Sequence, residues 1–140
     1  MGRAKLNPPY LLIFWLLLLA YQPAFATAII NVEWDKKFGG NNWDHAHAIL
    51  QTKDGGFAVA GTTFSKGAGS TDIWIIRLDT NGNWLWEKTF GGSNGDSAYS
   101  MVQTTDGGFV VAGTTRSDLG YDNYWILKLN SNCLISVLVP

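Results

Sequence analysis

A ten-residue motif that occurs twice constrains the fold of this chain more than any other feature. Residues 54–63 read DGGFAVAGTT and residues 106–115 read DGGFVVAGTT, so the two copies lie 106 − 54 = 52 residues apart. A period of this size, with glycine-rich turns between short apolar runs, is typical of stacked small antiparallel sheets. The sequence therefore predicts a repetitive all-β fold.

The repeat extends beyond this motif. Residues 34–40 (WDKKFGG) recur as residues 86–92 (WEKTFGG) at the same spacing of 52. Residues 74–78 match residues 125–129 at a spacing of 51, so the second copy lacks one residue in the polar stretch before them. A surface loop absorbs such a deletion at little cost. We expect two units, residues 44–92 and residues 96–139.

Each unit is predicted to form a four-stranded antiparallel sheet, like the blade of a propeller. Short runs rich in Val, Ile, Thr and aromatic residues favour strands, and no 3.6-residue period supports helices. The expected strands cover residues 46–52, 57–63, 73–78 and 84–90 of the first unit and residues 98–104, 109–115 and 124–129 of the second. A degenerate fourth strand should follow at residues 132–139, where Ile135 and Val137 replace two tryptophans.

The repeated Asp-Gly-Gly triplets are predicted to be structural turns. Glycine permits the positive φ angles of a tight hairpin, and an aspartate side chain can bond its own backbone. The turn residues are Asp54, Gly55 and Gly56 in the first unit and Asp106, Gly107 and Gly108 in the second. In the strands that they connect, both alternating faces are apolar, which favours sheets covered on both sides.

Residues 1–26 are predicted to be a secretory signal peptide. Arg3 and Lys5 precede an apolar run over residues 11–20, and Ala24 and Ala26 match the small residues of a cleavage site. A membrane anchor is the alternative, but the run is half of the roughly 20 residues that a span requires. We therefore expect residues 27–140 to be secreted or at the cell surface, with membrane attachment only through an uncleaved signal segment.

Composition bounds the function classes. The 140-residue chain is 46% hydrophobic and 15% charged, as in globular proteins. Removing Arg3 and Lys5 with the signal peptide leaves 8 − 11 = −3 formal charges, which argues against a nucleic-acid partner. Cys133 is the single cysteine, so it forms no internal disulfide; it is either unpaired or bridges two chains.

A spare strand is expected before the first unit, at residues 30–38. Residues 32–38 match the fourth strand of the first unit. Our hypothesis is that this strand completes the sheet of the second unit, in its own chain or in a neighbour's, and displaces the degenerate tail.

The motifs resemble those of a known repeat group. The sequence WxKxFGG, then Asp, then DGGFxVAGTT, then residues 72–82 (DIWIIRLDTNG), is similar to the roughly 50-residue repeats of secreted bacterial and archaeal surface proteins. Those repeats are taken as β-propeller blades related to the kelch and quinoprotein types. The resemblance covers nearly all of residues 27–140 and implies extracellular binding or display. Residues 78–86 also resemble the tryptophan-docking stretch of quinoproteins, which packs between blades.

Two units are too few to close a propeller, which needs roughly four to eight blades. Self-association, a lone two-sheet domain, and a fragment of a longer array or a remnant without a separate role all stay open. We expect a non-catalytic binding or display module with a glycan or protein ligand. An enzyme of the quinoprotein or glycan-cleaving kind is the alternative, although no catalytic constellation is visible in the sequence.

Candidate sites are few. Asp44, His45 and His47 form one metal-like cluster, since imidazoles and a carboxylate suit zinc or copper. The matching residues in the second unit are Ser97 and Tyr99, which favours an ordinary surface pair.

Calcium and an aromatic ligand surface are the other two predictions. Asp44, Asp96, Asp72 and Asp122 lie in glycine-rich loops that could hold calcium or cap turns. Most tryptophans stand at repeated positions and are expected in the core. Trp43, Tyr121 and Tyr124 escape the strict repeat and are the candidates for an exposed ligand-binding surface.

Overall fold

The computed structural model describes residues 30–116 and 118–131, which form seven strands and no helix. Both sheets belong to the compact unit of residues 33–140. The predicted signal peptide at residues 1–26 and the predicted last strand at residues 132–139 lie outside the described residues.

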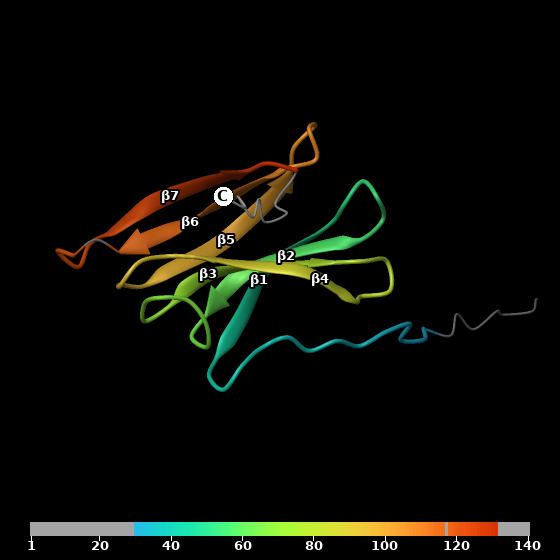
Figure 1. Ribbon diagram of the computed structural model, residues 1–140, viewed down its shortest axis with the longest axis horizontal. Helices are drawn as coiled ribbons and strands as arrows, with labels where there is room; N and C mark the ends of the chain where they lie inside the picture. The colour runs from blue at the N-terminus through green and yellow to red at the C-terminus, as the bar shows by residue number, and fades with distance from the viewer. Residues whose placement is uncertain (1–29, 117, 132–140) are drawn as a thin grey trace, which may run out of the picture. The chain divides into compact units, whose positions relative to one another are not determined.

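The first sheet is an antiparallel meander of strands in chain order, β1 (Asp44–Gln51), β2 (Phe57–Thr63), β3 (Asp72–Leu78) and β4 (Trp84–Phe90). The second sheet repeats the pattern with β5 (Asp96–Gln103), β6 (Phe109–Arg116) and β7 (Asp122–Leu129). Figure 1 shows the two sheets as two layers. The prediction of an all-β fold with two antiparallel sheets is confirmed, and three strands of the second sheet are described.

The Asp-Gly-Gly triplets lie at the turns between β1 and β2 and between β5 and β6. Gly55 and Gly107 have φ angles of 86° and 84°, which disfavour side chains at both positions. Asp54 accepts a hydrogen bond from the hydroxyl of Thr52 at 2.6 Å. Asp106 accepts the equivalent bond from Thr104. The first three residues of the repeated motif therefore form the turn of each hairpin.

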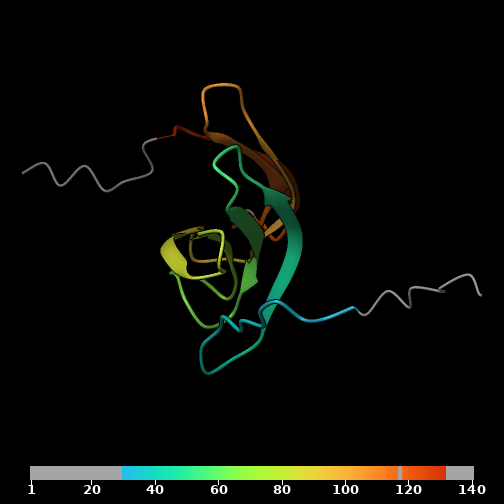
Figure 2. The same cartoon turned by 90° about the vertical axis from the view of Figure 1, so that its right-hand side faces the viewer.

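Both sheets carry the same irregularity in their first strands. The pairing of β1 with β2 passes from Ala46 to Ala48, and that of β5 with β6 passes from Ala98 to Ser100. His47 and Tyr99 are thus the extra residues of two equivalent β-bulges. A bulge bends its strand, and Figure 2 shows the strong curvature of β1.

The main core lies between the two sheets. Its buried side chains come from both, namely Ala58, Ala60, Ile73, Ile75, Ala98, Met101, Phe109 and Val111. Trp86 also packs into it, with its ring 6.4 Å from that of Phe109, whereas Trp84 is 58% exposed. Of these two tryptophans in the predicted docking stretch, Trp86 alone packs between the sheets.

The predicted extra strand at residues 30–38 is wrong, because no strand forms before Asp44 in the described chain. Nor do these residues extend the second sheet. Trp34 and Phe38 instead pack on the outer face of the first sheet, against Phe57 and the cluster of Trp74, Ile76 and Leu78. That face is apolar, so burying it with two large side chains competes with pairing at a sheet edge.

Candidate functional site

A cleft of about 550 Å³ opens where the two sheets meet, at the ends of the strands that carry Asp44 and Asp96. Its walls come from both units. The lining residues are Trp43, His45, His47, Thr62, Phe64, Ser70, Thr71, Gly95, Ser97, Tyr99, Thr114, Arg116 and Asp122.

The cleft is built from the same repeat positions of each unit, but with different side chains. At the spacing of 52, Trp43 matches Gly95, His45 matches Ser97, His47 matches Tyr99 and Phe64 matches Arg116, whereas Thr62 and Thr114 are alike. The first unit therefore supplies four rings together with the hydroxyl residues Thr62, Ser70 and Thr71. The second unit supplies two hydroxyl residues, a guanidinium, a carboxylate and one ring.

The rings form a continuous row across the two sheets. The ring of Phe64 lies 6.3 Å from that of His45, His45 lies 6.3 Å from His47, and His47 lies 5.6 Å from Tyr99. The two bulges make the last contact, because His47 and Tyr99 are the residues that their strands leave unpaired. A row of this kind offers a ligand several ring faces and edges.

Opposite charges balance on the polar side of the cleft. The Arg116 guanidinium donates to Asp122 at 2.8 Å, and both side chains are about half exposed. This hydrogen bond raises the pKa of Arg116 and lowers that of Asp122. The pair adds hydrogen-bonding capacity without adding net charge.

Asp44 makes hydrogen bonds with neighbouring loops. Its carboxylate accepts bonds from the Thr63 hydroxyl at 2.5 Å, the Ser65 hydroxyl at 2.8 Å and the Gly40 amide at 3.0 Å. Burial raises the pKa of Asp44, but the bonds from Thr63 and Ser65 outweigh it and the pKa ends below its ordinary value. These bonds hold the first residue of β1 against the neighbouring loops.

The metal cluster proposed at Asp44, His45 and His47 stays a prediction. The two imidazoles do lie side by side. Within the part of the chain that the structure describes, no group of three His, Cys, Asp or Glu side chains is close enough to hold a metal ion.

Two other aspartates of the calcium prediction are buried. Asp72 and Asp96 are each 1% exposed. Asp72 accepts bonds from the Ala68 and Gly69 amides, both at 3.1 Å, and Asp96 accepts one from the Gly92 amide at 2.9 Å. The Oδ1 atom of Asp96 has no hydrogen-bond partner among the described residues. Calcium binding there stays a prediction.

The three aromatic residues predicted to bind ligand do not gather in one place. Trp43, which is 72% exposed, lines the cleft. Tyr124, which is 95% exposed, lies on β7, and Tyr121 precedes that strand. Phe64, Tyr99 and Arg116 line the cleft and were not predicted. Each stands where the two copies differ, and that difference is the signal that could have found them.

Comparison with protein-family models gave no match, and comparison with curated proteins gave none either. No helix in the described ranges, residues 30–116 and 118–131, is long and apolar enough to cross a membrane.

Proposed function

We propose that this protein is a secreted binding or display module, built from two propeller-type repeats, that holds a neutral glycan in the cleft between its sheets. The row of rings formed by Phe64, His45, His47 and Tyr99 is the observation that carries this proposal. The C–H faces of a sugar ring pack on aromatic faces, while its hydroxyl groups need nearby polar partners.

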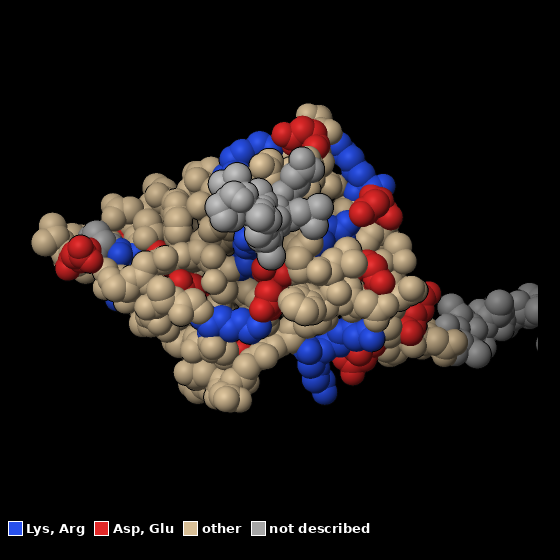
Figure 3. Space-filling view, viewed as in Figure 1, with Lys and Arg blue, Asp and Glu red and all other residues tan. Residues whose placement is uncertain are grey.

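The polar wall of the cleft suits such a ligand. Ser97 and Thr114 lie beside the ring row, and Arg116 and Asp122 add donors and acceptors. Because these two charges cancel, the cleft favours an uncharged ligand over an anion. Figure 3 shows acidic and basic side chains interspersed over one face of the molecule, which fits a neutral ligand better than a polyanion.

Glycan-array binding of the exported chain tests the proposal. We expect binding of one class of neutral glycan, and Tyr99→Ala or Phe64→Ala should weaken it by about tenfold or more, because aromatic anchors carry much of the binding energy. Trp84→Ala is the matched control, since Trp84 is an exposed aromatic residue outside the cleft. An array without any bound glycan, or binding that survives both cleft substitutions, would contradict the proposal.

A further inference from the structure

The two sheets pack through unlike faces. We call face A the surface that the first sheet turns toward the core, which carries Leu50, Ala58, Ala60, Ile73 and Ile75. We call face B the surface that the second sheet turns toward the core, which carries Met101, Phe109, Val111, Leu127 and Leu129. The core is therefore a contact of face A with face B.

The repeat gives each sheet both faces. At the spacings of 52 and 51, face B of the first sheet consists of Ile49, Phe57, Val59, Ile76 and Leu78, and Trp74 lies with them. Face A of the second sheet consists of Val102, Val110, Ala112, Tyr124 and Ile126. One molecule thus carries one spare copy of each partner surface.

Three of the five residues of the spare face A are exposed in the described structure, whereas Val110 and Ala112 are half-buried. Val102 is 57% exposed, Tyr124 95% and Ile126 61%. Their counterparts in the first unit are Leu50, Ile73 and Ile75, which lie in or against the buried core. Large apolar side chains that are exposed on one face of a sheet mark a candidate interaction surface.

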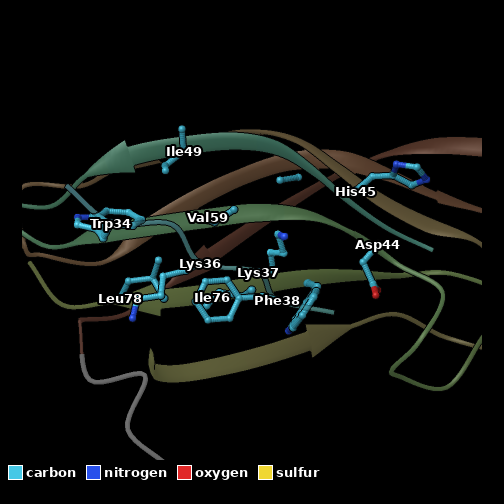
Figure 4. Close-up of a pocket in the computed structure, with 12 residues that line it drawn as sticks. Trp34, Lys36, Lys37, Phe38, Asp44, His45, Ile49, Val59, Ile76 and Leu78 are labelled. Carbon is cyan, nitrogen blue, oxygen red and sulfur yellow. The ribbon is translucent and has the colours of Figure 1, made fainter. Parts of the chain in front are cut away.

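The spare face B is covered, but incompletely. Trp34 and Phe38 lie across it, and a cavity of about 430 Å³ remains between their segment and the sheet (Figure 4). Ile49 on this face stays 64% exposed. Residues 33–38 make no hydrogen bond to the sheet among the described residues. Side-chain packing and the attraction of Lys36 to Asp79 hold this segment in place.

We propose that face A of the second sheet binds face B of the first sheet of a second copy, with residues 33–38 moving aside. Face B of a second copy is the expected partner, because face A of the first sheet packs against face B of the second sheet in the core of each molecule. Such head-to-tail contacts close into rings or continue as filaments. A ring of roughly four to eight sheets would need about two to four copies of this chain. This contact is independent of any ligand in the cleft.

The solution mass of residues 27–140, the chain without the predicted signal peptide, tests the contact. Light scattering measures this mass over a range of protein concentrations. We expect an assembly of two to four copies, or larger ones that grow with concentration. Ile126→Lys on face A and Ile49→Lys on face B should each weaken association by about 100-fold or more, since each would bury an unpaired charge. Both residues are more than half exposed in one copy, so both variants should fold.

Mixing the two variants identifies the faces. Ile126→Lys keeps a good face B and Ile49→Lys keeps a good face A, so an equal mixture should form a heterodimer although each variant alone is monomeric. Leu119→Lys is the control, because Leu119 is 83% exposed and lies on neither face. A monomer at every concentration overturns the proposal, as does an assembly that survives Ile126→Lys. A mixture that stays monomeric overturns the head-to-tail arrangement.

Discussion

The third strands of the two units, β3 and β7, occupy the same place in the repeat but differ in burial. Ile73 and Ile75 on β3 are fully buried, whereas their counterparts Tyr124 and Ile126 on β7 are 95% and 61% exposed. β3 has a strand on each side, the second sheet on one face and Trp34 with Phe38 on the other. In the described residues β7 pairs with β6 alone. Neighbours, and not the repeat position, decide burial here.

The largest effect is expected when one isoleucine side chain of β3 and one of β7 are shortened, which tests the difference in burial between the two strands. Ile75→Ala should lower the free energy of unfolding by about 2–5 kcal/mol, because it leaves a cavity between the sheets. Ile126→Ala should lower it by about 0.5 kcal/mol or less in dilute protein, because the side chain is exposed. Urea unfolding measures both. Equal losses at low concentration would show that Ile126 is as buried in solution as Ile75.

A smaller test compares the cations of the third strands. Arg77 is 7% exposed and donates to Asp54 at 2.5 and 2.6 Å and to the Phe57 carbonyl at 3.1 Å. Its counterpart Lys128 reaches Asp106 at 3.1 Å from an exposed position.

Substituting these cations should give unequal losses of stability. Arg77→Met should lower the free energy of unfolding by about 1–3 kcal/mol, since it orphans carbonyl groups of the first sheet. Lys128→Met should lower it by about 0–1 kcal/mol, as for other surface ion pairs. Thermal unfolding of the two variants at one pH would separate them, and a reversed order would contradict the burial argument.

Local signals allowed most of the strands to be predicted. Asp-Gly-Gly and Asn-Gly turns bounded by apolar runs predicted residues 57–63 and 84–90, which are the bounds of β2 and β4. The predictions for β1, β3, β5, β6 and β7 begin and end within two residues of the observed bounds. Turn residues and the alternation of side chains along a strand act over a few residues. They can therefore be recognised in a single sequence.

Non-local features escaped prediction. Residues 34–38 match a fourth strand in sequence, yet Trp34 and Phe38 cover a sheet face, because the apolar cluster on β3 offers more burial than an edge would. The ring row of the cleft depends on two bulges, and a bulge leaves little trace in a pattern of alternation. The prediction that both faces of each sheet are covered holds for the first sheet, and in the described residues face A of the second is open.

The smallest effect is expected at the turn aspartates of the two units. The Thr52 hydroxyl and then Arg77 lower the pKa of Asp54, and the Thr104 hydroxyl and then Lys128 lower that of Asp106, both from an ordinary 3.8. A carboxyl with a lowered folded-state pKa adds stability above about pH 4 and loses it as the pH falls. Asp54→Asn and Asp106→Asn should therefore each flatten the fall in urea midpoint between pH 7 and pH 3 by a small amount. Flattening by both variants would show that the two turns act in the same way, whereas flattening by Asp54→Asn alone would extend the difference between the units to their turns.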